Sequence, residues 1–166
     1  MAPTTYTPPI NTYVPLESIV LTNAASSVTF FNIAQSDANG TYKDLVIVFS
    51  GSISTSYNTP FYLNGDTTAG NYSKVSMYGT GASAATNTVF GAIWAGYTNT
   101  VIYQVMDYSA SDKHTTVLAR SNGASNEVSA QAIRWANTAP VTSFTMSAGS
   151  NTFTSGSSFT LFALHG

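Results

Sequence analysis

The sequence predicts an all-β protein: one antiparallel β-sandwich, jelly-roll-like, behind an extended N-terminal arm. Short runs of β-branched and aromatic residues recur, with turn residues about every 8 to 12 positions, as in sandwiches and barrels. Helical periodicity is nearly absent. The length of 166 residues suits one all-β domain. We place the arm at residues 1–17 and the sandwich at residues 18–166.

Four prolines favour an extended backbone in the N-terminal arm. Pro3, Pro8, Pro9 and Pro15 remove backbone donors and bias the residues before them toward extended geometry. The apolar residues between them need something to bury against, although a frayed terminus is the plainer alternative. The residues expected to contact a partner or a neighbouring subunit are Tyr6, Pro8, Pro9, Ile10, Tyr13 and Val14.

The first half of the domain predicts five strands separated by turns. The expected strands are residues 18–22, 28–33, 44–49, 59–63 and 72–78. Leu45–Phe49 is continuously apolar, which indicates a strand buried on both faces. Asn64, Gly65 and Asp66 supply the chemistry of a tight turn. Residues 82–87 are small and polar, so we expect an exposed loop there.

The second half continues the pattern to the C-terminus. The expected strands are residues 88–95, 100–108, 115–120, 127–135, 141–147 and 158–165. The last of these is apolar on both sides: Phe159 and Leu161 share one face, and Phe162 and Leu164 share the other. We predict that this strand lies inside a sheet interface or a subunit contact.

The amino-acid composition limits the kinds of molecule that the chain is expected to bind. Charged residues make up 7% of the chain, against roughly 25% in average domains, so the surface is neutral and rich in hydroxyl and amide groups. The basic residues are scattered, and direct binding to nucleic acid is not expected. There is no cysteine, hence no disulfide. With no secretory signal pattern and no long apolar run, we expect no membrane segment and synthesis in the cytoplasm of the producing cell.

Candidate chemistry is sparse. His114 and His165 are the two histidines, and no Gly-x-Ser-x-Gly elbow marks a nucleophile. Asn64, Asp66 and Asn71 offer oxygen ligands for calcium in principle, but a hairpin turn explains them more simply. The scattered carboxylates leave a glycosidase pair open without supporting one. We expect no catalytic residue, no metal site and no cofactor.

Several stretches together are similar to a known family. They are residues 42–48, 61–66, 71–73, 77–79, 116–121, 133–135, 140–145 and 153–162. In this order and spacing the chain resembles jelly-roll virion proteins of tailed bacteriophages, which occur as small accessory capsid proteins and as terminal modules of fibres. The resemblance runs from about Val28 to the C-terminus. It implies a jelly roll without catalysis, usually a homotrimer, displayed on the outside of the virion.

Two functions follow as expectations. The first is a capsid decoration, or cement, protein that binds the major capsid protein shell, is located on its outer surface, and is made in the bacterial host cytoplasm. The second is a tail or head fibre module that recognises host surface glycans through loops such as residues 54–59 and 82–87. The chain has no long shaft or separate docking domain, which favours decoration. A carbohydrate-active enzyme on the same fold ranks last.

Overall fold

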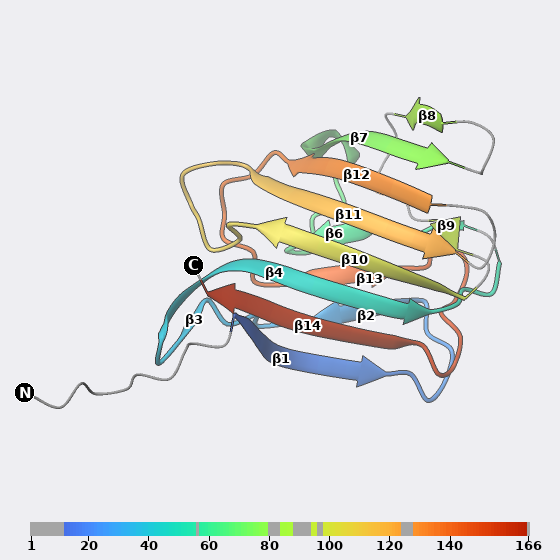
Figure 1. Ribbon diagram of the computed structural model, residues 1–166, viewed down its shortest axis with the longest axis horizontal. Coiled ribbons are helices and arrows are strands. Elements are labelled where there is room, and N and C mark those ends of the chain that lie inside the picture. The colour runs from blue at the N-terminus through green and yellow to red at the C-terminus, as the bar shows by residue number, and fades with distance from the viewer. Residues whose placement is uncertain are drawn as a thin grey trace, which may run out of the picture.

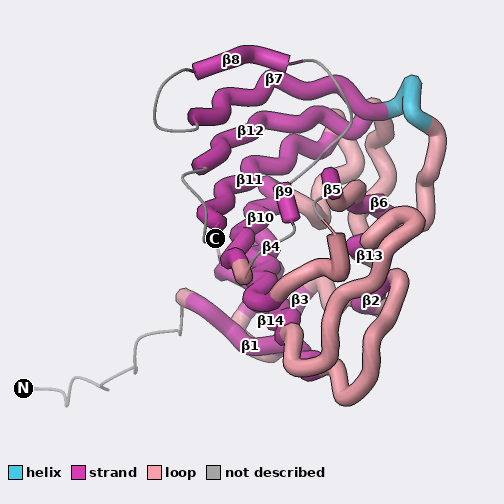
Figure 2. The backbone as a smooth tube through the Cα atoms, turned by 90° about the vertical axis from the view of Figure 1, so that its right-hand side faces the viewer, coloured by secondary structure: helices cyan, strands magenta, loops and turns pink. Residues whose placement is uncertain are grey.

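The computed structural model describes residues 12–55, 57–79, 84–87, 94–95, 98–123 and 128–165. It confirms the predicted all-β class and the antiparallel sandwich: a large sheet and a small sheet form two layers (Figures 1 and 2). The helical structure among these residues is a single 3₁₀ turn, η1 (Ala69–Asn71). The described residues hold no helix of the length and hydrophobicity that a bilayer crossing requires.

The large sheet follows the order β1-β14-β4-β10-β11-β12-β7-β8, and β3 pairs with β4 outside this path. Its strands are β1 (Tyr13–Val20), β3 (Ser36–Asp37), β4 (Gly40–Gly51), β7 (Tyr72–Gly79), β8 (Ala84–Asn87), β10 (Asn99–Met106), β11 (Thr115–Gly123), β12 (Val128–Trp135) and β14 (Ser158–His165). Every pairing in it is antiparallel.

The small sheet has the order β2-β13-β6 and lies against one face of the large sheet (Figure 2). Its strands are β2 (Ser27–Phe30), β13 (Phe144–Ser147) and β6 (Phe61–Leu63). A separate pair joins β5 (Tyr57–Asn58) to β9 (Trp94–Ala95). The chain passes repeatedly between the two layers, so strands far apart in the sequence become neighbours, as β1, β14 and β4 do.

The core between the layers is built from aromatic rings. Phe61 and Phe144 stack with their centroids 5.4 Å apart, and Tyr103 packs against both of them at 5.3 Å. A second cluster joins Phe49 and Phe159 at 4.9 Å, with Phe153 beside them. Large aromatic side chains bury much apolar surface, so these clusters hold the sheets together.

Two expectations about the sheet edges need correction. β1 begins at Tyr13, so residues 13–17 of the predicted arm are paired with β14. Residues 84–87 form β8 and pair with β7, where an exposed loop was predicted. Most of the strand predicted at residues 88–95 lies outside the described residues.

Candidate interaction surface

The large sheet has a face turned away from the small sheet, which we call the outer face. Along β4, Leu45, Ile47 and Phe49 point into the core, and the alternate residues Val46 and Val48 point outward. Cross-strand partners share a face, so the register extends this assignment across the sheet. The outer face can therefore be described as rows of partners that run from β14 to β7.

Two central rows cross the middle of the outer face. All their members except Thr160, Gln104 and Arg120 are apolar. The first row is Phe162, Val46, Gln104, Leu118, Ala132 and Val75, and the second is Thr160, Val48, Ile102, Arg120, Ala130 and Met77. The rows on either side are richer in polar residues, among them Ser50, Thr100, Asn122, Asp44, Thr116 and Arg134. An apolar centre with a polar rim is the usual arrangement of a protein interface.

Exposed apolar side chains gather on this face. Among the described residues, every exposed large apolar side chain except Phe31 belongs to it: Tyr13, Val20, Val75, Met77, Met106, Leu118 and Val128. Val75 is 62% exposed and Met77 61%. Single exposed apolar residues are ordinary, but a contiguous apolar surface on a folded chain marks a place of interaction.

The small sheet's outward side chains are of the opposite character. They are Ser27, Thr29, Thr145 and Tyr62, and the hydroxyls of Thr29 and Thr145 lie 2.9 Å apart in a hydrogen bond. This face is suited to water, while Phe144 and Met146 of the same strand β13 face the core. The two outer surfaces of the sandwich therefore differ, and only that of the large sheet is apolar.

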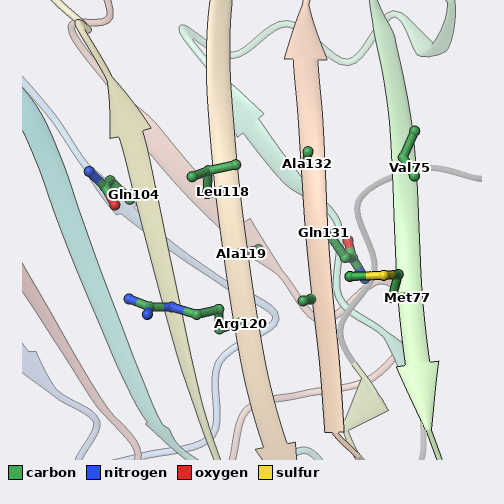
Figure 3. A pocket seen from close by; sticks show the side chains of 9 residues that line it. Val75, Met77, Gln104, Leu118, Ala119, Arg120, Gln131 and Ala132 are labelled. Carbon is green, nitrogen blue, oxygen red and sulfur yellow. The ribbon is translucent and has the colours of Figure 1, made fainter.

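Small residues on β12 hollow the outer face into a trench. Ala130 and Ala132 form its floor, Leu118 and Arg120 on β11 form one wall, and Val75 and Met77 on β7 form the other. Its volume is about 380 Å³. Figure 3 shows the side chains that line it. Arg120 extends from β11 toward β10 (Figure 3) and also borders a second hollow, which contains Ile102 and Val128.

Bulky side chains gather on the opposite part of the outer face: Tyr13 on β1 is 56% exposed, and Phe162 and Leu164 on β14 are partly exposed. We call this group the ridge. The rings of Tyr13 and Phe162 meet edge to face with centroids 6.1 Å apart. The four residues predicted to form a subunit interface on the last strand therefore lie on two different faces. Phe162 and Leu164 face outward, while Phe159 and Leu161 are buried in the core of the same chain.

Of the predicted contact residues of the arm, two lie within the described residues and four do not. Tyr13 and Val14 lie in β1, where Tyr13 is 56% exposed and Val14 is partly buried against the core. Tyr6, Pro8, Pro9 and Ile10 lie outside the described residues. The first residue of β1, Tyr13, is thus itself part of the ridge.

The turn at residues 64–66 holds neighbouring segments together. Asn64 accepts hydrogen bonds at Oδ1 from the backbone N–H groups of Thr142 (2.7 Å) and Ser143 (3.1 Å). Asp66 accepts hydrogen bonds at Oδ2 from Trp135 Nε1 (2.7 Å) and Asn71 Nδ2 (2.8 Å). The bonds from Trp135 and Asn71 hold the pKa of Asp66 at about 2, against an ordinary 3.8. These hydrogen bonds give the turn a structural role. Among the described residues, no group of acidic or histidine side chains is arranged to hold a metal.

The two histidines have different surroundings. His114 is exposed in the connection between β10 and β11. His165 Nε2 lies 3.2 Å from Asp37 Oδ2, and its ring packs on Tyr42 with centroids 4.8 Å apart. Desolvation opposes ionisation of Asp37, but bonds from the Asn39 backbone N–H and from Tyr42 outweigh it and lower its pKa. The contacts fasten the β3–β4 hairpin to the last strand.

Other perturbed groups also reflect packing. The side chains of Lys113 and Asp107 form an ion pair that lowers the pKa of Asp107. Burial lowers the pKa of Lys74 to about 8 and raises that of Tyr103 above its ordinary range. Both of the last two groups point toward the inner side of the large sheet, away from the outer face. Burial alone explains their shifts, so they do not by themselves mark a reaction centre.

Comparisons with known proteins add little. No protein-family model matches the chain, and no curated protein is similar to it in sequence. One solved structure with a weak match is an alginate lyase in complex with an alginate tetrasaccharide. It is 11% identical, the match covers 83% of this chain and 79% of the lyase, and the TM-score is 0.23. A likeness at that level carries no argument about function.

Proposed function

We propose that this chain is a structural protein of a tailed-bacteriophage virion, a capsid decoration (cement) protein that binds the major capsid protein shell from outside and stabilises it. The observation that carries the proposal is the outer face: a broad apolar sheet surface on a chain with few charges. Such a surface favours a protein that works in an assembly, because exposing it to water is unfavourable.

The sequence resemblance supports the same role. It covers strands of both layers, although not β1, and implies a jelly-roll homotrimer on the particle surface. The surface composition fits a protein that is crowded beside many copies of itself, because neutral hydroxyl groups neither repel one another nor attract nucleic acid. In this proposal the major capsid protein and further copies of the chain are the partners, and no cofactor takes part.

The arm supplies the attachment in this proposal. Tyr6, Pro8, Pro9 and Ile10 combine apolar contact groups with a backbone that prolines keep extended, which lowers the entropy lost when the arm becomes ordered on a partner. β1 continues from it into the sheet, so a docked arm would tether the whole sandwich.

Binding to empty capsids of the phage that encodes the chain tests the function. Electron microscopy of capsids mixed with the purified protein should show density on the outer surface of the shell. A variant lacking residues 1–11 leaves β1 whole, so it should fold normally and bind with reduced occupancy; Ser27→Arg, on the far small sheet, is the control and should bind as the wild type does.

Three results would count against the proposal. Absence of binding by the full-length protein rejects decoration, and undiminished binding by the variant without residues 1–11 rejects the role of the arm. Density confined to the tail, together with adsorption of the purified protein to host cells, would favour the alternative of a fibre module that recognises host glycans.

A further inference from the structure

We infer that the outer face is covered by other copies of this chain, packed head to tail, so that the ridge of one copy fills the trench of the next. This inference goes beyond the proposed function because it assigns the surface and the polarity of the contact. It rests on the proposed function only for the expected number of copies, three.

The size of the outer face suits a subunit contact. The seven strands from β1 to β7 span about 29 Å at ~4.8 Å per strand, and strands of eight residues span about 26 Å at ~3.3 Å per residue. The face thus covers about 750 Å², and a head-to-tail ring divides it between two neighbours at about 375 Å² each, so the two contacts together approach the ~800 Å² that one partner buries in a standard interface.

The outer face has bulky side chains at one end and small side chains at the other, so one end of a copy can fit the other end of a second copy. The ridge residues Tyr13, Phe162 and Leu164 stand on β1 and β14, and the trench floor of Ala130 and Ala132 lies on β12. β14 and β12 are four strand spacings apart, about 19 Å, so a ridge cannot reach the trench of its own sheet. It can enter the trench of another copy, where aromatic rings would fill the space above the two alanines and restore close packing.

The outer face carries a negative charge beside the ridge and positive charges near the trench. Asp44 is the cross-strand partner of Leu164, beside the ridge. Arg134 lies one row from Ala132 on the same strand, and Arg120 borders the trench with the base of its side chain while the rest extends toward β10 (Figure 3). The side chains of both arginines make no hydrogen bond or ion pair with other described residues. Asp44 already accepts hydrogen bonds from Gln104 Nε2 (2.6 Å) and the Asp107 N–H (2.8 Å), but a carboxylate has further acceptor sites.

Head-to-tail packing would bring these opposite charges together at the polar rim, whereas ridge against ridge would bring the two Asp44 carboxylates together. In a head-to-tail contact one ridge and one trench stay unused, and a ring closes when the rotation between copies permits it, whereas a two-fold pair would place both ridges in both trenches at once and stop at a dimer. The arm is a weaker candidate for the occupant, because a single extended segment covers the trench or the ridge but not the whole face.

Cysteine cross-linking tests the assignment without background, since the chain contains no cysteine. The variants Phe162→Cys and Ala132→Cys place one thiol on the ridge and one in the trench. Treated with a short bismaleimide, a mixture of the two should give a covalent dimer, and the double variant should give a covalent ring of three. Ser27→Cys mixed with Ala132→Cys is the control and should stay uncross-linked. Circular dichroism melting curves confirm that each variant is folded.

The outcomes separate this inference from the proposed function. Folded variants that give no ridge-to-trench product overturn the inference, as does a product from Phe162→Cys alone at equal yield, which would mean ridge against ridge. Loss of the product when residues 1–11 are removed would assign the contact to the arm and also overturn it. A cross-linked ring that fails to bind capsids leaves the inference standing and rejects decoration.

Discussion

At the scale of single residues, Asp66 shows how few charges this fold uses and how firmly it fixes one of them. The carboxylate accepts a hydrogen bond from the indole of Trp135, a side chain that is 1% exposed, and two more from Asn71 and the Thr68 backbone N–H. The Tyr72 hydroxyl donates to the Asp66 carbonyl at 3.0 Å. The turn after β6, the start of β7 and the end of β12 therefore meet at one acidic group.

Replacing Asp66 should make the free energy of unfolding less dependent on pH in the acidic range. The pKa of Asp66 in the folded chain is about 2, below the ordinary 3.8, so its stabilising effect is present above about pH 4 and is lost as the pH falls toward 2. Asp66→Asn should lower the free energy of unfolding at pH 7 by about 1–3 kcal/mol, the cost of disturbing a charged hydrogen-bond acceptor.

Urea unfolding from pH 7 to pH 2 measures this effect. The difference between wild type and Asp66→Asn should shrink below pH 4. Asp112→Asn, at an exposed position between β10 and β11, is the control and should match the wild type throughout. A difference that stays constant down to pH 2 would mean that the charge of Asp66 does not stabilise the turn.

At the scale of elements, β4 and the start of β14 approach one another closely at Gly51. A Cβ atom added there would lie 2.3 Å from Ser157 Oγ and 2.9 Å from Ser157 Cα, which is closer than real contacts allow. Ser157 is itself 1% exposed, and its hydroxyl lies 3.4 Å from the backbone N–H of Ser52. The absence of a side chain at residue 51 lets the two strands lie together at this end of the sheet.

Gly51→Ala should therefore destabilise the fold by about 1–3 kcal/mol, the usual cost of forcing atoms into a packed site. Gly70→Ala is the matched control, since an added Cβ there meets nothing within 4 Å. Thermal unfolding followed by circular dichroism compares the two. Equal melting temperatures for both variants would show that the strands separate at Gly51 without cost.

The central strands of the large sheet are predictable from the sequence, and its edge strands are not. The central strand at Leu45–Phe49 was predicted because continuous apolar residues mean burial, and there Val46 is 8% exposed even on the outer face. The misses lie at the sheet edges. Pro15 made residues 13–17 resemble an arm, yet proline is tolerated on an edge strand, and the pairing shifts register between Pro15 and Glu17. Residues 84–87 pair as the opposite edge, β8, although they are small and polar.

The candidate surface was only partly predictable for a different reason. The apolar character of both sides of the last strand pointed to Phe162 and Leu164, but periodicity alone could not tell which side faces the core. The trench needs Leu118 and Arg120, Ala130 and Ala132, and Val75 and Met77 to be neighbours, and that depends on the register of three strands. Alternation along β12 points the wrong way, because the polar Ser129 and Gln131 lie on its buried side and Val128 on its exposed side.

At the scale of the whole molecule, the two outer surfaces of the sandwich differ in chemical character. One is lined with hydroxyl groups and suits water, and the other exposes valine, methionine and leucine over the width of the large sheet. Covering the second surface with copies of the same chain would leave the neutral, hydroxyl-rich side facing outward. That arrangement would suit a protein displayed on a particle and joined to it by an N-terminal arm.

Sedimentation equilibrium of the purified chain tests this account most directly, with Ala132→Arg and Ser27→Arg as a matched pair. Wild type and Ser27→Arg should sediment as a trimer. Ala132→Arg places an unpaired charge in the trench, so it should raise the dissociation constant at least ~100-fold and yield a folded monomer. A wild-type protein that remains monomeric at micromolar concentrations, or a trimer that Ala132→Arg leaves intact, would contradict it.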